Sequence, residues 1–250
     1  MNVFDLTIHD KEKVELSSIF LADSSRETIE QLLKEHTYQE ELSQYGLPIN
    51  NKLLLHGSSG CGKTMTAKAI ANALGKSIMI LNLSNIVNAR IGDTSKNIKQ
   101  VFDAAARRKA VLFLDEFDQI GKARGSSEKD VGEMRRLVNT IIQLIDYYPE
   151  NALLICATNH LDIIDTALLR RFQLKLNFSL PTAEVLDDYY DSLLARFPKH
   201  LQGINRQYNI SFGEARDRTF TLVKGVLLKE LEEKSACQSV DKNTQKPVEL

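Results

Sequence analysis

The sequence predicts an α/β protein in which helices sandwich a parallel sheet, with a small all-helical domain after the sheet. Short apolar runs alternate with longer amphipathic stretches between residues 52 and 178. A glycine-rich segment follows the first apolar run, and beyond Pro181 helical periodicity continues without strand-like runs. Strands that alternate with helices are typical of a parallel sheet covered on both faces.

Each element is predicted from its local pattern. A first helix is expected after residue 22, because Asp23 and Ser24 are of types that cap helices and apolar residues then recur at helical spacing. The predicted strands are Lys52–His56, Ile78–Leu83, Val111–Leu114, Leu153–Cys156 and Leu174–Phe178. Helices are expected to begin near Lys63, Ser95, Val131 and Thr166, and two further helices cover Thr182–Phe197 and Glu214–Glu233.

These patterns divide the chain into four parts. Residues 1–22 are expected to form an N-terminal arm or hairpin, and residues 23–180 form the α/β domain. Residues 181–233 form the helical lid. The polar segment 234–250 is expected to be a disordered tail, as chain ends of this composition commonly are.

Composition excludes several classes of protein. The 250 residues include 32 Lys and Arg against 33 Asp and Glu, so the net charge of -1 gives no general attraction to nucleic acid or anionic lipid. No apolar stretch approaches the roughly 18 residues of a membrane span, and the first residues lack the order of a signal peptide. Cys61, Cys156 and Cys237 have neither metal-ligand nor disulfide-framework spacing. We therefore expect a cytoplasmic protein without membrane contacts, and a nucleic-acid partner is not expected.

The first strand leads directly into a phosphate-binding motif. Gly57-Ser58-Ser59-Gly60-Cys61-Gly62-Lys63-Thr64 matches the pattern G-x-x-x-x-G-K-[ST]. Glycines let successive backbone N–H groups point at phosphates, and the helix that follows adds its positive dipole end. Lys63 would reach the β- and γ-phosphates of ATP, and Thr64 would bind Mg²⁺. The motif predicts the sheet of a P-loop NTPase.

The third predicted strand supplies two carboxylates. Asp115 and Glu116 follow four apolar residues, at the C-terminal edge where open α/β sheets bind ligands. Asp115 would hold Mg²⁺, and Glu116 would orient and polarise the attacking water.

The segments around these motifs resemble the ATPase module of the AAA family. The resemblance lies in LLLHGSSGCGKTMTAKAIANALG, in SKNIKQVFDAAARRKAVLFLDEFDQIG and in ICATNHLDIIDTALLRRF. It implies that Asn159 contacts the γ-phosphate and the attacking water, as an amide is able to do. The family's fold, with ATP and Mg²⁺ as ligands, is implied as well.

The resemblance also implies a role between subunits. Arg170 and Arg171 match the family's arginine fingers, which enter the ATP site of the neighbouring copy and stabilise the transferring phosphoryl group. A site completed by another copy implies a homo-oligomer, and a hexameric ring is the family expectation. Ser211-Phe212-Gly213-Glu214 resembles the start of the lid helix, which makes Gly213 a candidate nucleotide contact.

One segment departs from the family's pattern. Members that thread polypeptides usually carry an aromatic residue where this chain has Arg90-Ile91-Gly92. Three functions follow as alternatives: a motor that remodels, unfolds or translocates proteins; a nucleotide-gated switch or assembly factor that controls a partner enzyme such as a protease without threading; and a nucleic-acid loader. The third is disfavoured, since a loader needs a basic groove for phosphates.

Overall fold

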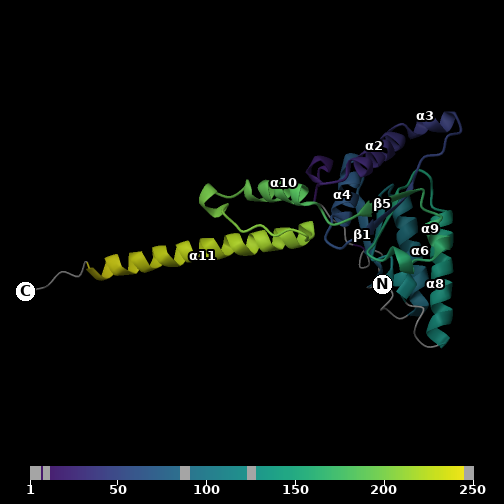
Figure 1. Cartoon of the computed structure of the whole chain (residues 1–250). Coiled ribbons are helices and arrows are strands. Elements are labelled where there is room, and N and C mark those ends of the chain that lie inside the picture. Colours follow the sequence, from purple (N-terminus) through teal and green to yellow (C-terminus); the bar gives the residue numbers. More distant parts are fainter. Residues whose placement is uncertain (1–6, 8–11, 85–90, 123–127, 245–250) are drawn as a thin grey trace, which may run out of the picture. The chain divides into compact units, whose positions relative to one another are not determined.

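A computed structural model describes residue 7 and residues 12–84, 91–122 and 128–244 of the chain. Within these ranges, only the backbone is described for 91–94, 121, 122, 128–135 and 236–244. The chain divides into two compact units, Met1–Ser179 and Leu180–Leu250, and many of their elements are labelled in Figure 1.

The first unit contains a parallel sheet. Its strands are β1 (Lys52–Gly57), β2 (Ile78–Asn82), β3 (Val111–Asp115), β4 (Leu154–Thr158) and β5 (Leu174–Phe178). They lie in the order β2-β3-β4-β1-β5, and every recorded pairing is parallel. This order puts the C-terminal ends of β1, β3 and β4 next to one another at one edge.

Helices connect these strands and cover the sheet. The helices of the first unit are η1 (Leu16–Ser18), α2 (Asp23–Thr37), α3 (Gln39–Gln44), α4 (Lys63–Ala73), α6 (Ile91–Arg107), α7 (Gln119–Lys122), α8 (Glu128–Asp146), η2 (Leu161–Ile163) and α9 (Thr166–Leu169), where η denotes a 3-10 helix. The predicted α/β fold is confirmed, with each predicted strand present to within two residues at its ends. Helix α2 begins at Asp23 behind Ala22, without the side-chain cap that we expected.

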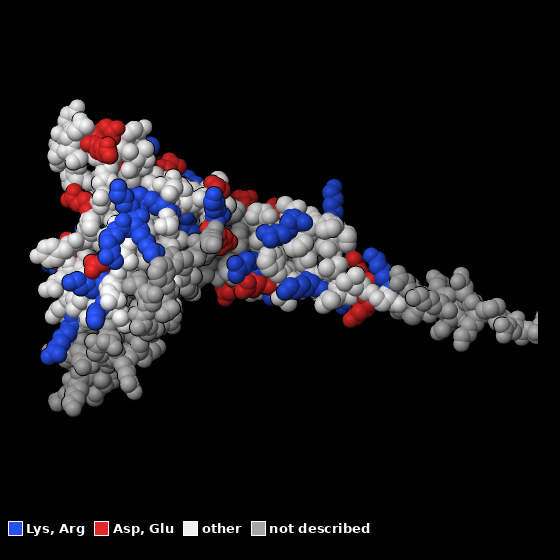
Figure 2. Space-filling view, turned by 180° about the vertical axis from the view of Figure 1, so that it is seen from behind, with Lys and Arg blue, Asp and Glu red and all other residues white. Residues whose placement is uncertain are grey.

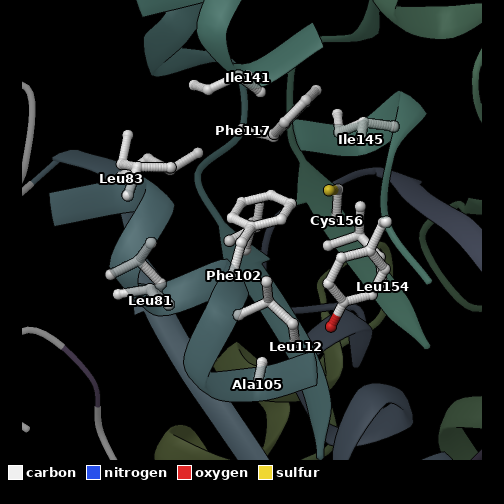
Figure 3. Close-up of a cluster of buried hydrophobic side chains, with 14 of the residues drawn as sticks. Leu81, Leu83, Phe102, Ala105, Leu112, Phe117, Ile141, Ile145, Leu154 and Cys156 are labelled. Atoms are coloured by element: carbon white, nitrogen blue, oxygen red, sulfur yellow. The ribbon is translucent and has the colours of Figure 1, made fainter. Parts of the chain in front are cut away.

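Two hydrophobic cores lie on opposite faces of the sheet. Alternate residues of the central strands point to each face, so that Leu112 packs toward α6 and α8 while Phe113 packs toward α2 and α4. Figure 3 shows the α6 and α8 side of this arrangement, where Phe102, Ile141 and Cys156 meet. Because both faces are covered, the central strands are continuous apolar runs and not alternating ones.

Strand β5 is an edge strand and its sequence shows this. Leu176 and Phe178 are buried on the α2 and α4 side, whereas Lys175 and Asn177 are exposed. A strand with one solvated face alternates apolar and polar residues. The alternation in LKLNF therefore follows from its position at the end of the sheet.

The second unit contains α10 (Ala183–Leu194), η3 (Lys199–Leu201) and α11 (Phe212–Thr244). Leu186 and Tyr190 of α10 pack on Ala215 of α11, and Leu194 packs on Val223. The predicted helical lid is thus present. Helix α11 continues beyond residue 233, where we expected a tail to begin. No Pro or Gly interrupts residues 234–244, so the backbone can remain helical until shortly before Pro247.

Capping residues start both long helices of this unit. The Thr182 hydroxyl accepts from the N–H of Val185 at the start of α10. Ser211 and Glu214 form a reciprocal capping box at the start of α11: the Ser211 N–H donates to Glu214 Oε2 at 2.8 Å, and the Glu214 N–H donates to Ser211 Oγ at 3.3 Å. The backbone hydrogen bond from Ser211 lowers the pKa of Glu214, which favours the charged form of the cap.

None of the helices in the described part of the chain has both the length and the apolar character that crossing a bilayer demands.

Candidate functional site

The phosphate loop lies between β1 and α4, and its glycines adopt backbone angles that other residues avoid. Gly57, Gly60 and Gly62 have φ of +125°, +71° and +97°. A Cβ on Gly57 would lie 2.2 Å from the carbonyl oxygen of Phe178, which also accepts from the Ser58 N–H at 2.8 Å. Close approach to β5 therefore requires glycine here and holds the start of the loop in place.

The tip of the loop is open to a ligand. Ser58, Ser59 and Gly60 are exposed, while Cys61 is buried against the core between β1 and α4. Helix α4 begins at Lys63, directly after Gly62, so the positive end of its dipole lies at the loop. An exposed loop at a helix N-terminus suits an anion.

Lys63 points back along the loop. Its ammonium donates to the carbonyl oxygens of Gly57 at 2.8 Å and Ser58 at 2.7 Å. The side chain is 8% exposed, and burial lowers the pKa of the ammonium although the neighbouring Asp115 raises it. A buried cation beside neutral carbonyls is poorly neutralised, so an anion at the loop would stabilise its charged form.

Thr64 and Asp115 lie together at the start of α4 and the end of β3. The Thr64 hydroxyl donates to Asp115 Oδ2 at 3.3 Å, and the Glu116 N–H donates to Asp115 Oδ1 at 2.9 Å. Burial raises the pKa of the Asp115 carboxyl. The hydrogen bonds from Glu116 and Thr64 lower this pKa, but by less than burial raises it. A hydroxyl and a desolvated carboxyl side by side fit Mg²⁺, which binds oxygen ligands.

Glu116 stands in a strained turn. Its φ of +54° lies in the left-handed region, which is rare for a residue other than glycine. The next residue, Phe117, donates its N–H to the carbonyl oxygen of Ala157 at 2.8 Å. The turn therefore leaves β3 and joins the end of β4 directly, and such strain is common at functional sites.

A buried polar pair links the ends of β3 and β4, and the sequence analysis missed it. The Thr158 hydroxyl donates to Asp118 Oδ1 at 3.1 Å and accepts from the His160 N–H at 3.0 Å. Thr158 is 1% exposed and Asp118 is 2% exposed. Asn159 lies between Thr158 and His160 and is exposed. The only sequence signals were a second Asp three residues after Asp115 and a Thr directly before Asn159.

Arg170 and Arg171 differ sharply in their surroundings. Arg171 forms a bidentate ion pair with Asp146 at the end of α8, with Nε–Oδ1 at 2.8 Å and Nη2–Oδ2 at 3.0 Å, and it also donates to the Ala167 carbonyl oxygen. Arg170 is exposed at the end of α9. No sequence signal identified Asp146 as a partner, because it is distant in the chain.

The segment with these arginines is anchored on the core. Asp165 caps α9 by accepting from the Ala167 N–H at 2.8 Å, and Leu168 is buried. Phe172, directly after Arg171, packs edge-to-face on Phe117 with ring centroids 5.7 Å apart. Phe117 directly follows Glu116, so the arginine segment contacts the turn that carries the catalytic candidate.

Two other sets of predicted residues lie in other parts of the chain. Gly213 lies in the second unit, one residue before the Glu214 cap. Arg90 lies outside the described residues, and Ile91 and Gly92 form the first turn of α6 by their backbone. In the described residues, no group of three or more His, Cys, Asp or Glu is placed to hold a metal by itself. Mg²⁺ would therefore need phosphate oxygens or waters beside Thr64 and Asp115.

Comparison with known families and solved structures identifies similar proteins. The family described as "ATPase family associated with various cellular activities (AAA)" matches residues 53–180, slightly more than half of the chain. The crystal structure of the FIGL-1 AAA domain is similar with a TM-score of 0.65 at 20% identity, covering 80% of this chain and 70% of that one. At this identity the likeness shows the fold.

Three relatives have higher identity. An uncharacterized AAA family ATPase of Sinorhizobium fredii, y4kL, is 36% identical over 155 residues, which are 62% of this chain and 47% of the relative. The human ATPase family gene 2 protein homolog A is 32% identical over 181 residues (69% and 20%). The ATP-dependent zinc metalloprotease FtsH 3 of Sphaerobacter thermophilus is 34% identical over 146 residues (57% and 30%). The chain spans less than half the length of each.

Proposed function

Because the chain belongs to the AAA family of ATPases, we propose that it hydrolyses Mg·ATP at the edge of its sheet and uses the energy to remodel a protein partner. One observation carries this proposal. The phosphate loop, the Thr64–Asp115 pair, Glu116 and Asn159 all lie where β1, β3 and β4 end side by side.

Each residue has a role that its position supports. The N–H groups of the loop and the Lys63 ammonium would bind the phosphates. Thr64 and Asp115 would hold Mg²⁺, and the ion would supply positive charge that stabilises the transferring group. Glu116 orients the attacking water and accepts its proton. Asn159 holds the water or a γ-phosphate oxygen through its amide.

Arg170 is the better candidate for a finger that acts in a neighbouring subunit. It is exposed, whereas Arg171 is held by Asp146 of its own subunit. Arg171 would then hold the segment that carries both arginines against its own subunit, and Arg170 would reach the γ-phosphate bound by the neighbouring subunit. Such sharing requires head-to-tail contacts, which either close into a ring or open into a spiral, and we propose a hexameric ring.

Mixing inactive variants tests this sharing. Glu116→Gln should bind ATP and hydrolyse it poorly, and Arg170→Ala should do the same for a different reason. In mixed oligomers some interfaces combine an intact Glu116 with an intact Arg170, so part of the turnover should return. Mixed oligomers of verified composition that stay inactive would contradict a site shared between subunits.

We propose a protein as the partner of this ATPase. The family includes a relative whose name describes an ATP-dependent protease, and a separate protease or effector is a fitting partner here. Unfolded or folded candidate proteins should stimulate ATP turnover and be altered by it. The matched control is Lys63→Ala, which should bind no nucleotide. An active ATPase that no protein stimulates would contradict the remodelling role.

A second candidate is a nucleotide-gated switch that controls a partner enzyme without threading it. The absence of an aromatic residue in Arg90-Ile91-Gly92 favours this candidate. Affinity capture with Glu116→Gln in ATP should then retain a partner that is lost in ADP, and Ile91→Ala should not change partner activity. Loss of partner processing in Ile91→Ala would support threading instead. We propose the cytoplasm as the location, since Cys156 is a buried free thiol.

A further inference from the structure

One aromatic contact joins the turn that carries Glu116 to the segment that carries Arg170. Phe117 directly follows Glu116, and Phe172 lies two residues after Arg170. The two rings meet edge-to-face, with centroids 5.7 Å apart and an angle of 88° between their planes. Both are buried, since Phe117 is 0% exposed and Phe172 is 3% exposed. We call this pair of rings the Phe117–Phe172 contact.

Phe117 is held at the junction of two strand ends. Its N–H donates to the Ala157 carbonyl oxygen at 2.8 Å, and Ala157 lies in β4, two residues before Asn159. Its ring belongs to the core on the α6 and α8 side, where Figure 3 shows it with Ile141. The position of Phe117 therefore depends on the Glu116 turn and on the end of β4, which together carry two of the proposed catalytic residues.

Phe172 belongs to the segment that presents Arg170. Leu168 is 2% exposed and lies in the same core as Phe172, and Arg170 lies two residues from each of them. The Arg171 N–H donates to the Leu168 carbonyl oxygen at 3.1 Å, and its guanidinium pairs with Asp146. The exposed Arg170 is thus carried on a short segment whose buried side chains determine where it lies.

The Glu116 turn is strained and is tied to the proposed ATP site. Its φ of +54° is disfavoured for a residue with a Cβ, so a different conformation of the turn would release strain. The Glu116 N–H donates to Asp115 Oδ1 at 2.9 Å, and the Thr64 hydroxyl donates to Asp115 Oδ2 at 3.3 Å. A change in the hydrogen bonds of Asp115 therefore acts directly on the residue before Phe117.

We propose that Phe172 is a positioning residue: its contact with Phe117 couples the Glu116 turn of one subunit to the Arg170 finger that the same subunit presents to its neighbour. The inference rests on the proposed ATPase function and on Arg170 as the finger. The state of a subunit's own ATP site then sets where its finger lies. Two buried rings suit this role, because closely packed side chains have discrete arrangements and transmit displacement. An aromatic pair contributes enough free energy to shift such an equilibrium about two- to tenfold.

A single tryptophan tests the coupling within one subunit. The chain contains no Trp, so Leu169→Trp places one fluorophore beside Arg170. Leu169 is partly buried against the core that contains Phe172, so its surroundings change when the segment moves. The full chain is diluted until light scattering shows a monomer, and a non-hydrolysable ATP analogue is added with Mg²⁺. We expect the fluorescence to change on binding, although no neighbouring subunit is present.

Substitutions of the two rings separate coupling from packing. Phe172→Leu in the Leu169→Trp chain should reduce the fluorescence change about two- to tenfold while the analogue is still bound. Phe117→Leu should have the same effect, and the double variant should lose no more than either single variant, because all three remove one contact. The matched control is Phe102→Leu, since Phe102 is 2% exposed in the same core and packs edge-to-face on Tyr148 with centroids 5.5 Å apart. The control should lower the melting temperature as Phe172→Leu does and leave the fluorescence change intact.

In the oligomer, turnover should change in a way that packing alone does not explain. Phe172→Leu misplaces Arg170 without changing the phosphate loop, so kcat should fall about tenfold and the KM for ATP should change little. The Phe102→Leu control should keep the wild-type kcat. Lys and Arg side chains gather on one face of the first unit (Figure 2), so contacts between copies depend on salt and all variants are compared at one ionic strength.

Three results would overturn the inference. The first is a fluorescence change in Phe172→Leu as large as in its Leu169→Trp parent. The second is an equal loss in Phe102→Leu, which would assign the effect to core packing in general. The third is a parent chain that binds the ATP analogue without any change in fluorescence. A wild-type chain that does not bind the analogue would contradict the proposed function as well.

Discussion

Replacing Thr158 with valine tests whether the buried Thr158–Asp118 pair positions Asn159. Valine has nearly the shape of threonine, but it removes the hydroxyl that donates to Asp118 at 3.1 Å and accepts from the His160 N–H at 3.0 Å. The hydrogen bond to His160 spans Asn159 in the chain, and the one to Asp118 holds Thr158, the residue directly before Asn159. Thr158→Val therefore perturbs the position of the Asn159 side chain without changing any residue of the phosphate loop.

The magnitude follows from the burial of the pair. A hydrogen bond to a buried carboxyl contributes about 1.5–3 kcal/mol and a neutral one about 1 kcal/mol, so Thr158→Val should lose about 3 kcal/mol of unfolding free energy. For a chain of this length that lowers the melting temperature by roughly 6–12 °C. A displacement of Asn159 by about 1 Å would reduce kcat by roughly a hundredfold.

Steady-state ATP turnover and thermal melts measure these effects. The KM for ATP should change little, because the contacts of the phosphate loop are intact, so the loss should appear in kcat. Thr158→Ser is the matched control, since it keeps the hydroxyl and removes only a methyl group. If Thr158→Val turns over ATP as fast as Thr158→Ser, the pair does not position Asn159 and the reasoning fails.

Three further predictions follow from the site. Gly57→Ala should abolish binding of a fluorescent ATP analogue, because its Cβ would lie 2.2 Å from a backbone oxygen of β5; wild-type affinity would contradict this. Asp115→Asn should raise the stability of the nucleotide-free chain near pH 7, because it removes a partly desolvated charge. Because burial raises the Asp115 pKa, the charge of Asp115 destabilises the folded chain at pH values above its ordinary pKa of 3.8. The gain in stability from Asp115→Asn should therefore vanish below pH 3.8 in thermal melts. A variant that is less stable than the wild type at neutral pH would refute this prediction. Arg170→Ala should keep its affinity for ATP and lower ATP turnover about a thousandfold. Arg171→Ala should in addition lose about 0.5–1 kcal/mol of unfolding free energy, because it removes the ion pair with Asp146. Equal melting temperatures for the two variants would argue against this difference.

The strands were predicted well because the apolar runs that indicate them involve only residues that are neighbours in the sequence. The apolar runs of β1 to β4 are buried on both faces, and they could be found without knowing their neighbours. The end of α11 was harder to predict, since a polar helix without Pro or Gly and a polar tail have similar composition.

The conformation of the glycine-rich loop is the part of the molecule that the sequence determined by itself. The spacing of Gly57, Gly62, Lys63 and Thr64 specifies a loop geometry, because glycine conformation and the following helix act within a few residues. Asp115 and Glu116 were also predictable, since the end of an apolar strand is a local feature.

Only the tertiary structure decided which distant side chains meet. Strand order places Asp118 against Thr158, and the end of α8 places Asp146 against Arg171, although neither pair shares a sequence signal. In the same way, Lys76 and Lys109 become neighbours because β2 pairs with β3 and the Val111 N–H donates to the Ser77 carbonyl oxygen. Such contacts arise from packing between segments far apart in the chain, which local conformational preference does not encode.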